Sequence, residues 1–161
     1  MAVPSAYSNE LQGLCLRSLT PQDGLKISRI LAESPEAAPW SADSLGDAAS
    51  NGMTAWVAEL NREVEGFLVG RLAAGEFEIL NMAVSKAQCK KGIASRLLAL
   101  ALEWAQGAGS TRALLEVRAS NEEAIRLYQR HGFAAWGRRK LYYRNPLEDA
   151  LLFARTFAEH F

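Results

Sequence analysis

A short basic turn in the middle of the chain has the residue types needed to bind an anion. The stretch from Lys90 to Ser95 reads KKGIAS and lies between an apolar run at 77–84 and an amphipathic segment ending near Trp104. The first turn of a helix has backbone N–H groups without internal partners and the positive end of the helix dipole, so it attracts phosphate. Gly92 would let an anion approach the backbone closely, and the two lysines add positive charge.

The turn by itself leaves two interpretations open. It lacks the Lys-Ser/Thr ending of a nucleotide P-loop and the three glycines of a dinucleotide-binding loop. A glycine at the start of a helix is also an ordinary way to connect a strand to a helix. The rest of the chain must therefore decide whether this turn binds a ligand.

Glu116 is the carboxylate that stands out in the sequence. Within residues 113–119, ALLEVRA, the two-residue period of a strand puts Glu116 on one face and the apolar Leu115 and Val117 on the other. An acid in the middle of such a strand faces water, pairs with a neighbouring arginine or lines a cleft. All three roles fit the sequence.

Tyr128 and Asn121 lie in the next amphipathic segment, NEEAIRLYQRH. Tyr128 could line a cleft, although aromatic side chains in such helices usually pack in the core with the hydroxyl at the rim. Asn121 falls in the first turn, where this residue type usually caps the helix. Both residues therefore have a structural role beside the functional one.

The histidines and cysteines do not form a recognisable site. His131 precedes Gly132 at an expected helix end, where an imidazole can interact with terminal carbonyls, and His160 is close to the C-terminus. Together with Cys15 and Cys89 they give no Ser/His/Asp set and no metal-ligand spacing, and nothing requires a disulfide. We expect no metal.

The composition is typical of one soluble globular domain. The chain has 161 residues, of which 49% are hydrophobic and 22% charged, and we expect a single domain over residues 1–161 with 1–12 flexible. A net charge of zero gives no field for nucleic acid or an anionic membrane. The N-terminus does not resemble a signal peptide, and no apolar run reaches the roughly 18 residues of a membrane span. We expect a cytoplasmic monomer or weak homodimer.

The periodicity of apolar residues predicts the elements that would position these side chains. Strands are expected at residues 13–19, 53–60, 64–74, 77–84, 113–119, 133–143 and 150–157. Helices are expected to begin at Thr20, Ser41, Gly92 and Ser120, with Ser120 as the N-cap of the last. The pattern predicts an α+β or α/β domain with a mixed sheet of about seven strands, an antiparallel meander of three, a central strand–helix–strand crossover and about four helices.

Four segments together resemble the GNAT superfamily of acetyltransferases: ILNMAV at 79–84, KKGIAS at 90–95, LEVRASNEEAIRLYQRHGF at 115–133 and YYRNPLEDALLF at 142–153. The resemblance covers most of residues 14–156. LEVRASN followed by AIRLY and GF is typical of the RimI-like N-terminal acetyltransferases within this superfamily. The resemblance implies a GNAT fold, in which two central strands splay apart, and acetyl-CoA as the acetyl donor.

The resemblance also implies a role for particular residues. A strand segment along the pantetheine arm, with a backbone N–H that polarises the thioester carbonyl, corresponds to Met82, Ala83 and Val84. A pyrophosphate-binding turn corresponds to Lys90, Lys91, Gly92, Ile93, Ala94 and Ser95, and a further coenzyme contact to Asn121. Glu116 matches the general base and Tyr128 the general acid.

Other positions extend this pattern or depart from it. Segments that contain Trp40, Tyr142 and Tyr143 flank the peptide groove in the resembled family, although core packing fits these residues as well. Cys89 stands where the family turn usually has Gln or Arg, with Gln88 beside it. Because the turn binds mainly through backbone N–H groups, we expect weaker coenzyme affinity at most.

The implied reaction is direct transfer of the acetyl group to the amine of the N-terminal alanine of a small-subunit ribosomal protein. Two alternatives remain open: an acetyltransferase that acts on a small amine or on protein lysines, and a non-catalytic acyl-CoA-binding module. The presence of both Glu116 and Tyr128 argues against the second alternative.

Overall fold

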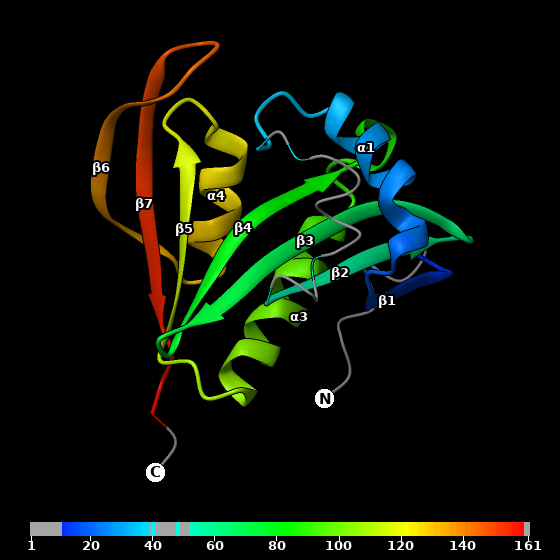
Figure 1. Ribbon diagram of the computed structural model, residues 1–161, viewed down its shortest axis with the longest axis horizontal. Coiled ribbons are helices and arrows are strands. Elements are labelled where there is room, and N and C mark those ends of the chain that lie inside the picture. The colour runs from blue at the N-terminus through cyan, green and yellow to red at the C-terminus, as the bar shows by residue number, and fades with distance from the viewer. Residues whose placement is uncertain (1–10, 39, 41–47, 49–51, 160–161) are drawn as a thin grey trace.

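The computed structural model describes residues 11–38, 40, 48 and 52–159 (Figure 1). In this part of the chain the strands are β1 (Leu14–Ser18), β2 (Met53–Leu60), β3 (Glu63–Ala73), β4 (Glu76–Val84), β5 (Arg112–Arg118), β6 (Ala134–Tyr143) and β7 (Glu148–Thr156). The α-helices are α1 (Gly24–Ala32), α3 (Ile93–Gly107) and α4 (Glu122–Arg130), with short 3-10 helices at Pro21–Asp23 and Lys86–Gln88. The helix expected from Ser41 lies outside the described residues.

All seven strands form one mixed sheet in the order β1-β2-β3-β4-β5-β7-β6. β2, β3 and β4 are the antiparallel meander that the sequence predicts, and β1 extends it. The chain then crosses over through α3 to β5, which runs parallel to β4, while β7 and β6 add antiparallel strands on the far side. The predicted fold class is confirmed.

β4 and β5 pair only where they begin. The parallel register joins 76–78 to 112–114 and goes no further, although β4 continues to Val84 and β5 to Arg118. The pairing of β4 with β3 also skips Leu80, and a bulge of this kind bends a strand. Figure 1 shows β4 and β5 moving apart beyond their paired ends. The sheet therefore has the splayed central strands that the resemblance implied.

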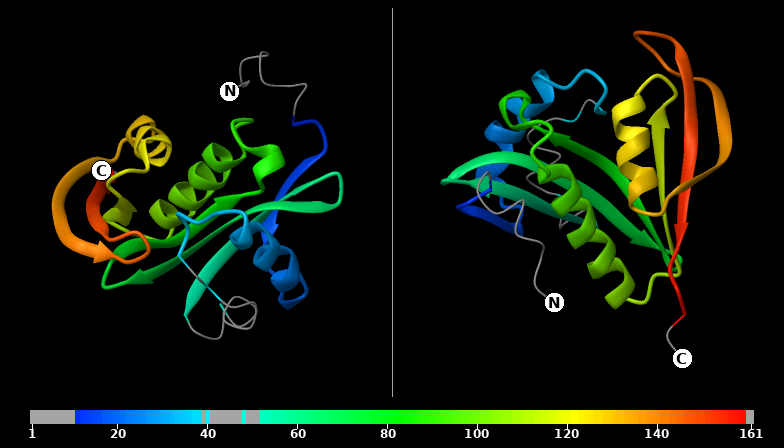
Figure 2. Two further views of the ribbon diagram at one scale, coloured as in Figure 1. Left: turned by 90° about the horizontal axis from the view of Figure 1, so that it is seen from above. Right: turned by 180° about the vertical axis from the view of Figure 1, so that it is seen from behind.

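Helices cover both faces of the sheet (Figure 2). α3 and α4 lie on one face over a core that includes Phe77, Leu97, Leu115, Val117 and Tyr128. α1 lies on the other face over a second core, formed by Ile27, Ile30, Val57, Val64, Phe67, Val69 and Ala83. Because side chains alternate along a strand, Leu115 and Val117 belong to the α3/α4 face and Glu116 to the opposite one.

The start of α4 differs from the prediction by one residue. Asn121 is the N-cap, and its side-chain oxygen accepts a hydrogen bond from the Ala124 N–H at 3.2 Å. The backbone N–H of Ser120 instead donates to Glu148 on β7. The expectation that Ser120 caps this helix was therefore wrong, because the amide side chain of Asn121 reaches the third N–H of the helix.

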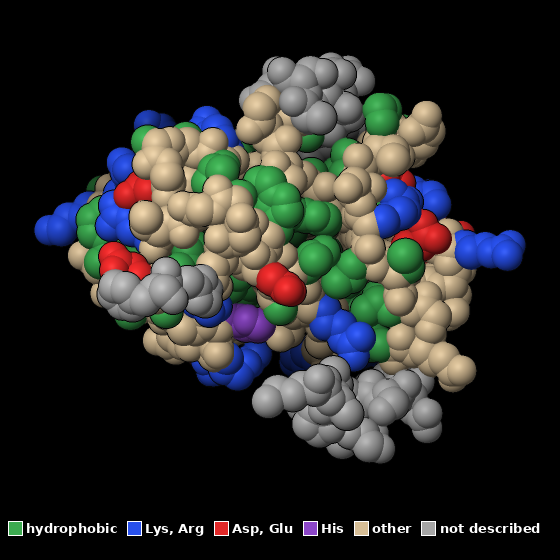
Figure 3. All heavy atoms as spheres, turned by 90° about the horizontal axis from the view of Figure 1, so that it is seen from below, with side chains coloured by type: hydrophobic (Ala, Val, Ile, Leu, Met, Phe, Trp, Pro, Cys, Tyr) green, Lys and Arg blue, Asp and Glu red, His purple; other side chains and the backbone are tan. Residues whose placement is uncertain are grey.

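Near the N-terminus, Leu11 and Gln12 form part of a turn, and Leu11 is buried in the α3/α4 core, although both fall in the stretch expected to be flexible. Figure 3 shows the underside of the molecule, where hydrophobic side chains gather in the middle with basic and acidic groups interspersed around them. Basic side chains are more prominent than acidic ones on this face, although the chain as a whole has zero net charge.

Candidate active site

A cavity of about 970 Å³ occupies the gap between β4 and β5. Its walls include residues 79–84 of β4 and 115–118 of β5, which are the parts of the two strands that do not pair with each other. The α4 helix and the start of α3 line it on one face of the sheet, and residues 34 and 36–38 line it on the other. The cavity thus passes through the sheet, and its volume is in the range of ligand sites.

The turn before α3 forms one wall of this cavity. Gly92 is the N-cap of α3 with φ of +91°, and Lys90 also has a positive φ, of +65°. The first hydrogen bond of the helix runs from the Arg96 N–H to the Gly92 carbonyl at 3.1 Å. The backbone N–H groups that precede Arg96 in this turn of α3 have no partner within the helix, so they are free to bind an anion.

The side chains of the turn leave its backbone accessible. Lys90 is exposed, while the Lys91 ammonium donates to the Gln88 side-chain oxygen at 3.2 Å. The thiol of Cys89 is free and approaches the backbone carbonyls of Ser85 and Val84 at 3.4 and 3.8 Å. Burial, with Glu123 and Glu33 nearby, raises the pKa of this thiol, so the neutral form is favoured.

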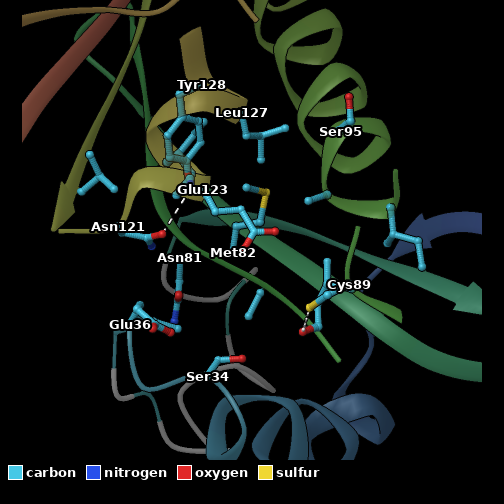
Figure 4. Close-up of a pocket in the computed structure, with 18 of the residues that line it drawn as sticks. Ser34, Glu36, Asn81, Met82, Cys89, Ser95, Asn121, Glu123, Leu127 and Tyr128 are labelled. Atoms are coloured by element: carbon cyan, nitrogen blue, oxygen red, sulfur yellow. Dashed lines mark hydrogen bonds between the residues drawn. The ribbon is translucent and has the colours of Figure 1, made fainter. Parts of the chain in front are cut away.

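Tyr128 projects from α4 into the same space. Figure 4 shows its ring facing Met82 of β4 across the cavity, with Leu127 and Glu123 beside it. The residue is 8% exposed, and its ring packs edge-on against Phe133 at a centroid distance of 5.7 Å. Burial is the main reason that the pKa of Tyr128 is raised well above its usual value of about 10. The phenol therefore keeps its proton throughout the ordinary pH range.

Glu116 reaches the cavity from the opposite face of β5. Its side chain is 27% exposed, and its carboxylate forms an ion pair with Arg139 of β6, Nε to Oε1 at 2.9 Å. A hydrogen bond with Glu116 is the first cause of a raised pKa at Tyr142. Glu116 therefore both lines the cleft and pairs with an arginine, two roles that the sequence had left as alternatives.

The three residues expected at the peptide groove lie in different places. Tyr143 lines the cavity, and burial and the charge of Glu116 raise its pKa to about 12. Tyr142 is 50% exposed and contacts Glu116 outside the cavity wall. Trp40 is partly buried against the α1-side core and is not part of the wall. Asn121 lines the cavity while its side-chain oxygen caps α4.

Two contacts near the cavity were not foreseen from the sequence. Ser95 in the first turn of α3 shares a hydrogen bond with His131, Oγ to Nε2 at 2.7 Å, which ties α3 to the end of α4. Burial and the charges of Arg155 and Arg130 lower the pKa of His131, so the ring is neutral at physiological pH. On the other face, the Asn81 amide donates to the Ala38 carbonyl at 3.0 Å. The only signal for these contacts in the sequence is the polar residue type.

In the described part of the chain, no three His, Cys, Asp or Glu side chains are grouped as a metal ion would require. No helix among the described residues is both long and apolar enough to cross a bilayer. The groups around the cavity include unpaired N–H groups at a helix start, a protonated phenol and a carboxylate. These are the parts of a group-transfer enzyme that binds an anionic donor.

Comparison with known proteins narrows this class. The family model described as acetyltransferase (GNAT) family matches residues 25–133, more than half of the chain. The chain therefore belongs to the GNAT family of acetyltransferases. This family transfers an acetyl group from acetyl-CoA, the donor that the resemblance had implied.

One curated relative has a named activity. The N-alpha-acetyltransferase RimI of Mycobacterium tuberculosis is 37% identical over 87 residues, which are 54% of this chain and 53% of the relative. The chain spans about half the length of the curated relatives that it matches.

Among solved structures, the ribosomal-protein-S18-alanine N-acetyltransferase from Escherichia coli matches with a TM-score of 0.81 at 25% identity, over 92% of this chain and 96% of that one. NAA60 from Arabidopsis thaliana, solved in complex with acetyl-CoA, shares the fold, with a TM-score of 0.80 at 21% identity over 89% of this chain and 98% of that one.

Proposed function

We propose that this protein is an acetyl-CoA-dependent N-alpha-acetyltransferase, which acetylates the N-terminal amine, by preference alanine, of a small-subunit ribosomal protein. The observation that carries the proposal is the cavity through the gap between β4 and β5. Glu116 lines it from the α1 face of the sheet, and Tyr128 and the turn before α3 line it from the α3/α4 face. Donor and acceptor can therefore enter from opposite faces.

The α3/α4 face fits the coenzyme. The backbone N–H groups at the start of α3, with Lys90 and Lys91 beside them, would hold its pyrophosphate. The edge of Met82, Ala83 and Val84 that faces β5 is not paired with that strand, so its backbone groups are available to the pantetheine arm and the thioester carbonyl. Acetyl-CoA as substrate supplies the thioester, and the protein supplies the hydrogen-bond donors around it.

Glu116 and Tyr128 divide the proton transfers between them. Glu116, directly or through one water, accepts a proton from the acceptor's ammonium group. The free amine then forms the N–C bond while the C–S bond breaks, and Tyr128 gives its proton to the departing sulfur. The acylated nitrogen loses its second proton to water, and the Tyr128 phenolate takes a proton back from water. The raised pKa of Tyr128 means that this proton is present at neutral pH.

The energy of deprotonation favours an N-terminus as acceptor. An α-amino group titrates near ~8 and a lysine side chain near ~10.4, so making the free amine costs about 3 kcal/mol less for the N-terminus. The names of two relatives agree, because the Escherichia coli protein is an S18-alanine acetyltransferase and the Mycobacterium tuberculosis protein is RimI. These similarities support a ribosomal-protein N-terminus as the acceptor.

The test is thiol release from acetyl-CoA over a panel of peptides that differ in the first residue. We expect the highest kcat/KM for a peptide that begins with alanine, and mass spectrometry should locate the acetyl group on the α-nitrogen. Two control peptides distinguish the α-amine from the lysine amine as acceptor. One has a blocked N-terminus and a free lysine side chain, and the other has a blocked N-terminus and no lysine. If only lysine or small amines were acetylated, the proposed acceptor would be refuted. If thiol were released equally with and without a free amine, acetyl transfer to an amine would be refuted.

A further inference from the structure

The carboxylate of Glu116 is already bound by a cation before any acceptor arrives. The Nε of Arg139 lies 2.9 Å from its Oε1, and the guanidinium stands over the Tyr142 ring at 5.5 Å from the centroid. Tyr142 in turn hydrogen bonds to Glu116. An acceptor whose amine is charged must therefore approach a carboxylate that has a partner on the neighbouring hairpin.

The charged neighbours of this carboxylate on β4 and β5 have partners of their own. On β5, Arg118 pairs with Glu148 of β7 at 3.0 Å, and on β4, Glu78 pairs with Arg71 at 2.7 Å. Tyr143 interacts electrostatically with Glu116, and Glu36 lines the cavity from the 36–38 segment. Among the described residues, the cation that forms an ion pair with Glu116 is Arg139.

The preceding residue on β6 provides a natural comparison. Arg138 also pairs with an acid, Asp149 of β7, at 2.7 Å. Its side chain is 53% exposed, close to the 57% of Arg139. Asp149, however, is not part of the cavity wall, whereas Glu116 is. Both arginines thus lie on β6, are similarly exposed and form an ion pair with an acid. They differ in whether that acid lies at the site.

We propose that Arg139 is a positioning residue for acetyl transfer: it anchors the Glu116 carboxylate from the β6 side and, as a cation beside that carboxylate, disfavours the ammonium form of the incoming amine. The inference deepens the proposed function and rests on it, since it needs an amine acceptor at this site.

The direction of the effect follows from the charges. With Arg139 present, an ammonium ion at the site meets an acid that is already neutralised, so the free amine is favoured. Without Arg139, the bare carboxylate would stabilise the ammonium ion, and the bound amine would lose its proton only at higher pH. The acceptor would bind at least as tightly but would react less often.

The experiment compares the pH dependence of kcat for the wild type, Arg139→Gln, Arg139→Lys and the control Arg138→Gln, with acetyl-CoA and a peptide that begins with alanine. In Arg139→Gln we expect the acid limb of kcat to move about one pH unit upward, which is roughly a tenfold loss at neutral pH, with no rise in the peptide KM. Arg139→Lys keeps the charge and should keep the limb near the wild-type position. Arg138→Gln should leave it unchanged.

The role of Arg139 would be overturned if the acid limb of kcat lay at the same pH in the wild type and in Arg139→Gln. It would also be overturned if Arg138→Gln shifted this limb by the same amount. A rise in the peptide KM with an unmoved limb would mean that the residue only supports the fold of the hairpin. The acceptor is tested separately with the wild-type protein. If the wild type acetylates a small amine and not the peptide, the proposed acceptor is wrong. The pH dependence of the same four proteins is then compared with that amine as acceptor.

Discussion

On the α3/α4 side of the gap the candidate site comes largely from one continuous stretch, residues 82–95, and much of what it offers is backbone N–H. On the α1 side it comes from segments far apart in the chain: residues 34 and 36–38, Glu116 on β5, and β6, where Tyr143 lines the cavity while Arg139 and Tyr142 contact Glu116. The first side needs a correct strand–turn–helix geometry, whereas the second needs a correct register between strands. We therefore expect substitutions in the turn before α3 to raise the KM for acetyl-CoA and those at Tyr142 to raise the KM for the peptide, while loss of either proton-transfer group, Glu116 or Tyr128, lowers turnover.

The largest effect should come from the α1 side, at Glu116. In Glu116→Gln the amide cannot take the proton from the acceptor, so turnover should fall on the order of a hundredfold or more, while the KM for acetyl-CoA stays the same. Steady-state kinetics with each substrate varied in turn would measure both constants.

The matched control for this substitution is Glu76→Gln. Glu76 also lies in a central strand and pairs with an arginine, Arg112, but it sits where β4 and β5 are still joined. It should keep wild-type turnover. An unchanged rate across pH in Glu116→Gln would remove Glu116 from the mechanism.

The second effect concerns the phenol on the α3/α4 side. Tyr128→Phe keeps the ring that packs on Phe133 and removes the proton donor, so turnover should fall about tenfold to a hundredfold. The loss is smaller than at Glu116 because a thiol with a pKa near ~8.5 leaves readily as the thiolate.

The wild-type pH profile gives an independent check on this residue. Because burial raises the pKa of Tyr128, the wild-type rate should hold as the pH rises to about 10. A decline through that range that disappears in Tyr128→Phe would contradict the protonated phenol. Thermal unfolding of the variant should stay close to that of the wild type.

The third effect isolates the backbone of the anion-binding turn. Gly92 has φ of +91°, and an added Cβ would meet nothing closer than a Leu11 methyl at 3.9 Å, so Gly92→Ala strains the backbone alone. The strain costs about 1–2 kcal/mol and should disturb the free N–H groups, raising the KM for acetyl-CoA about threefold to tenfold.

Gly75→Ala is the control for this strain. Gly75 has φ of +77° in the turn between β3 and β4, with open space around its Cβ. It should lose similar stability in urea unfolding and keep the wild-type KM for acetyl-CoA. If both variants raise this KM equally, the turn before α3 has no special part in coenzyme binding.

The smallest effect should be at the exposed phenol of the acceptor side. Tyr142→Ala removes the hydrogen bond to Glu116 and the ring under Arg139, so it should raise the KM for the peptide several-fold and that for acetyl-CoA much less. Both constants follow from initial rates at varied peptide and acetyl-CoA. Equal changes in the two would point to a folding defect.

The contrast between local geometry on one side of the gap and strand register on the other also explains which features of the structure the sequence could predict. Strand periodicity and the glycine before α3 are local, so β4, the turn and α3 were predicted to within a residue or two. The alternation in residues 113–119 also predicted that Glu116 faces away from Leu115 and Val117, as it does.

Contacts between distant segments could not be predicted in this way. The partner of Glu116 depends on the antiparallel registers of β5 with β7 and of β7 with β6, which periodicity does not specify. The contact of Ser95 with His131 likewise depends on how α3 and α4 pack. The capping of α4 shows the same limit at short range, since Ser120 and Asn121 are both good caps and side-chain geometry decides between them.

Because β4 and β5 pair over only three residues each, two unpaired strand edges lie in the middle of the sheet instead of at its outer edges. An edge strand on the outside of a sheet invites other chains to pair with it, which is a common start of aggregation. Here α3 and α4 cover one approach to these inner edges and the 34–38 segment flanks the other. The unpaired backbone N–H and C=O groups of β4 and β5 thus remain available to an extended ligand, while the covering elements hinder pairing with a strand of another protein chain.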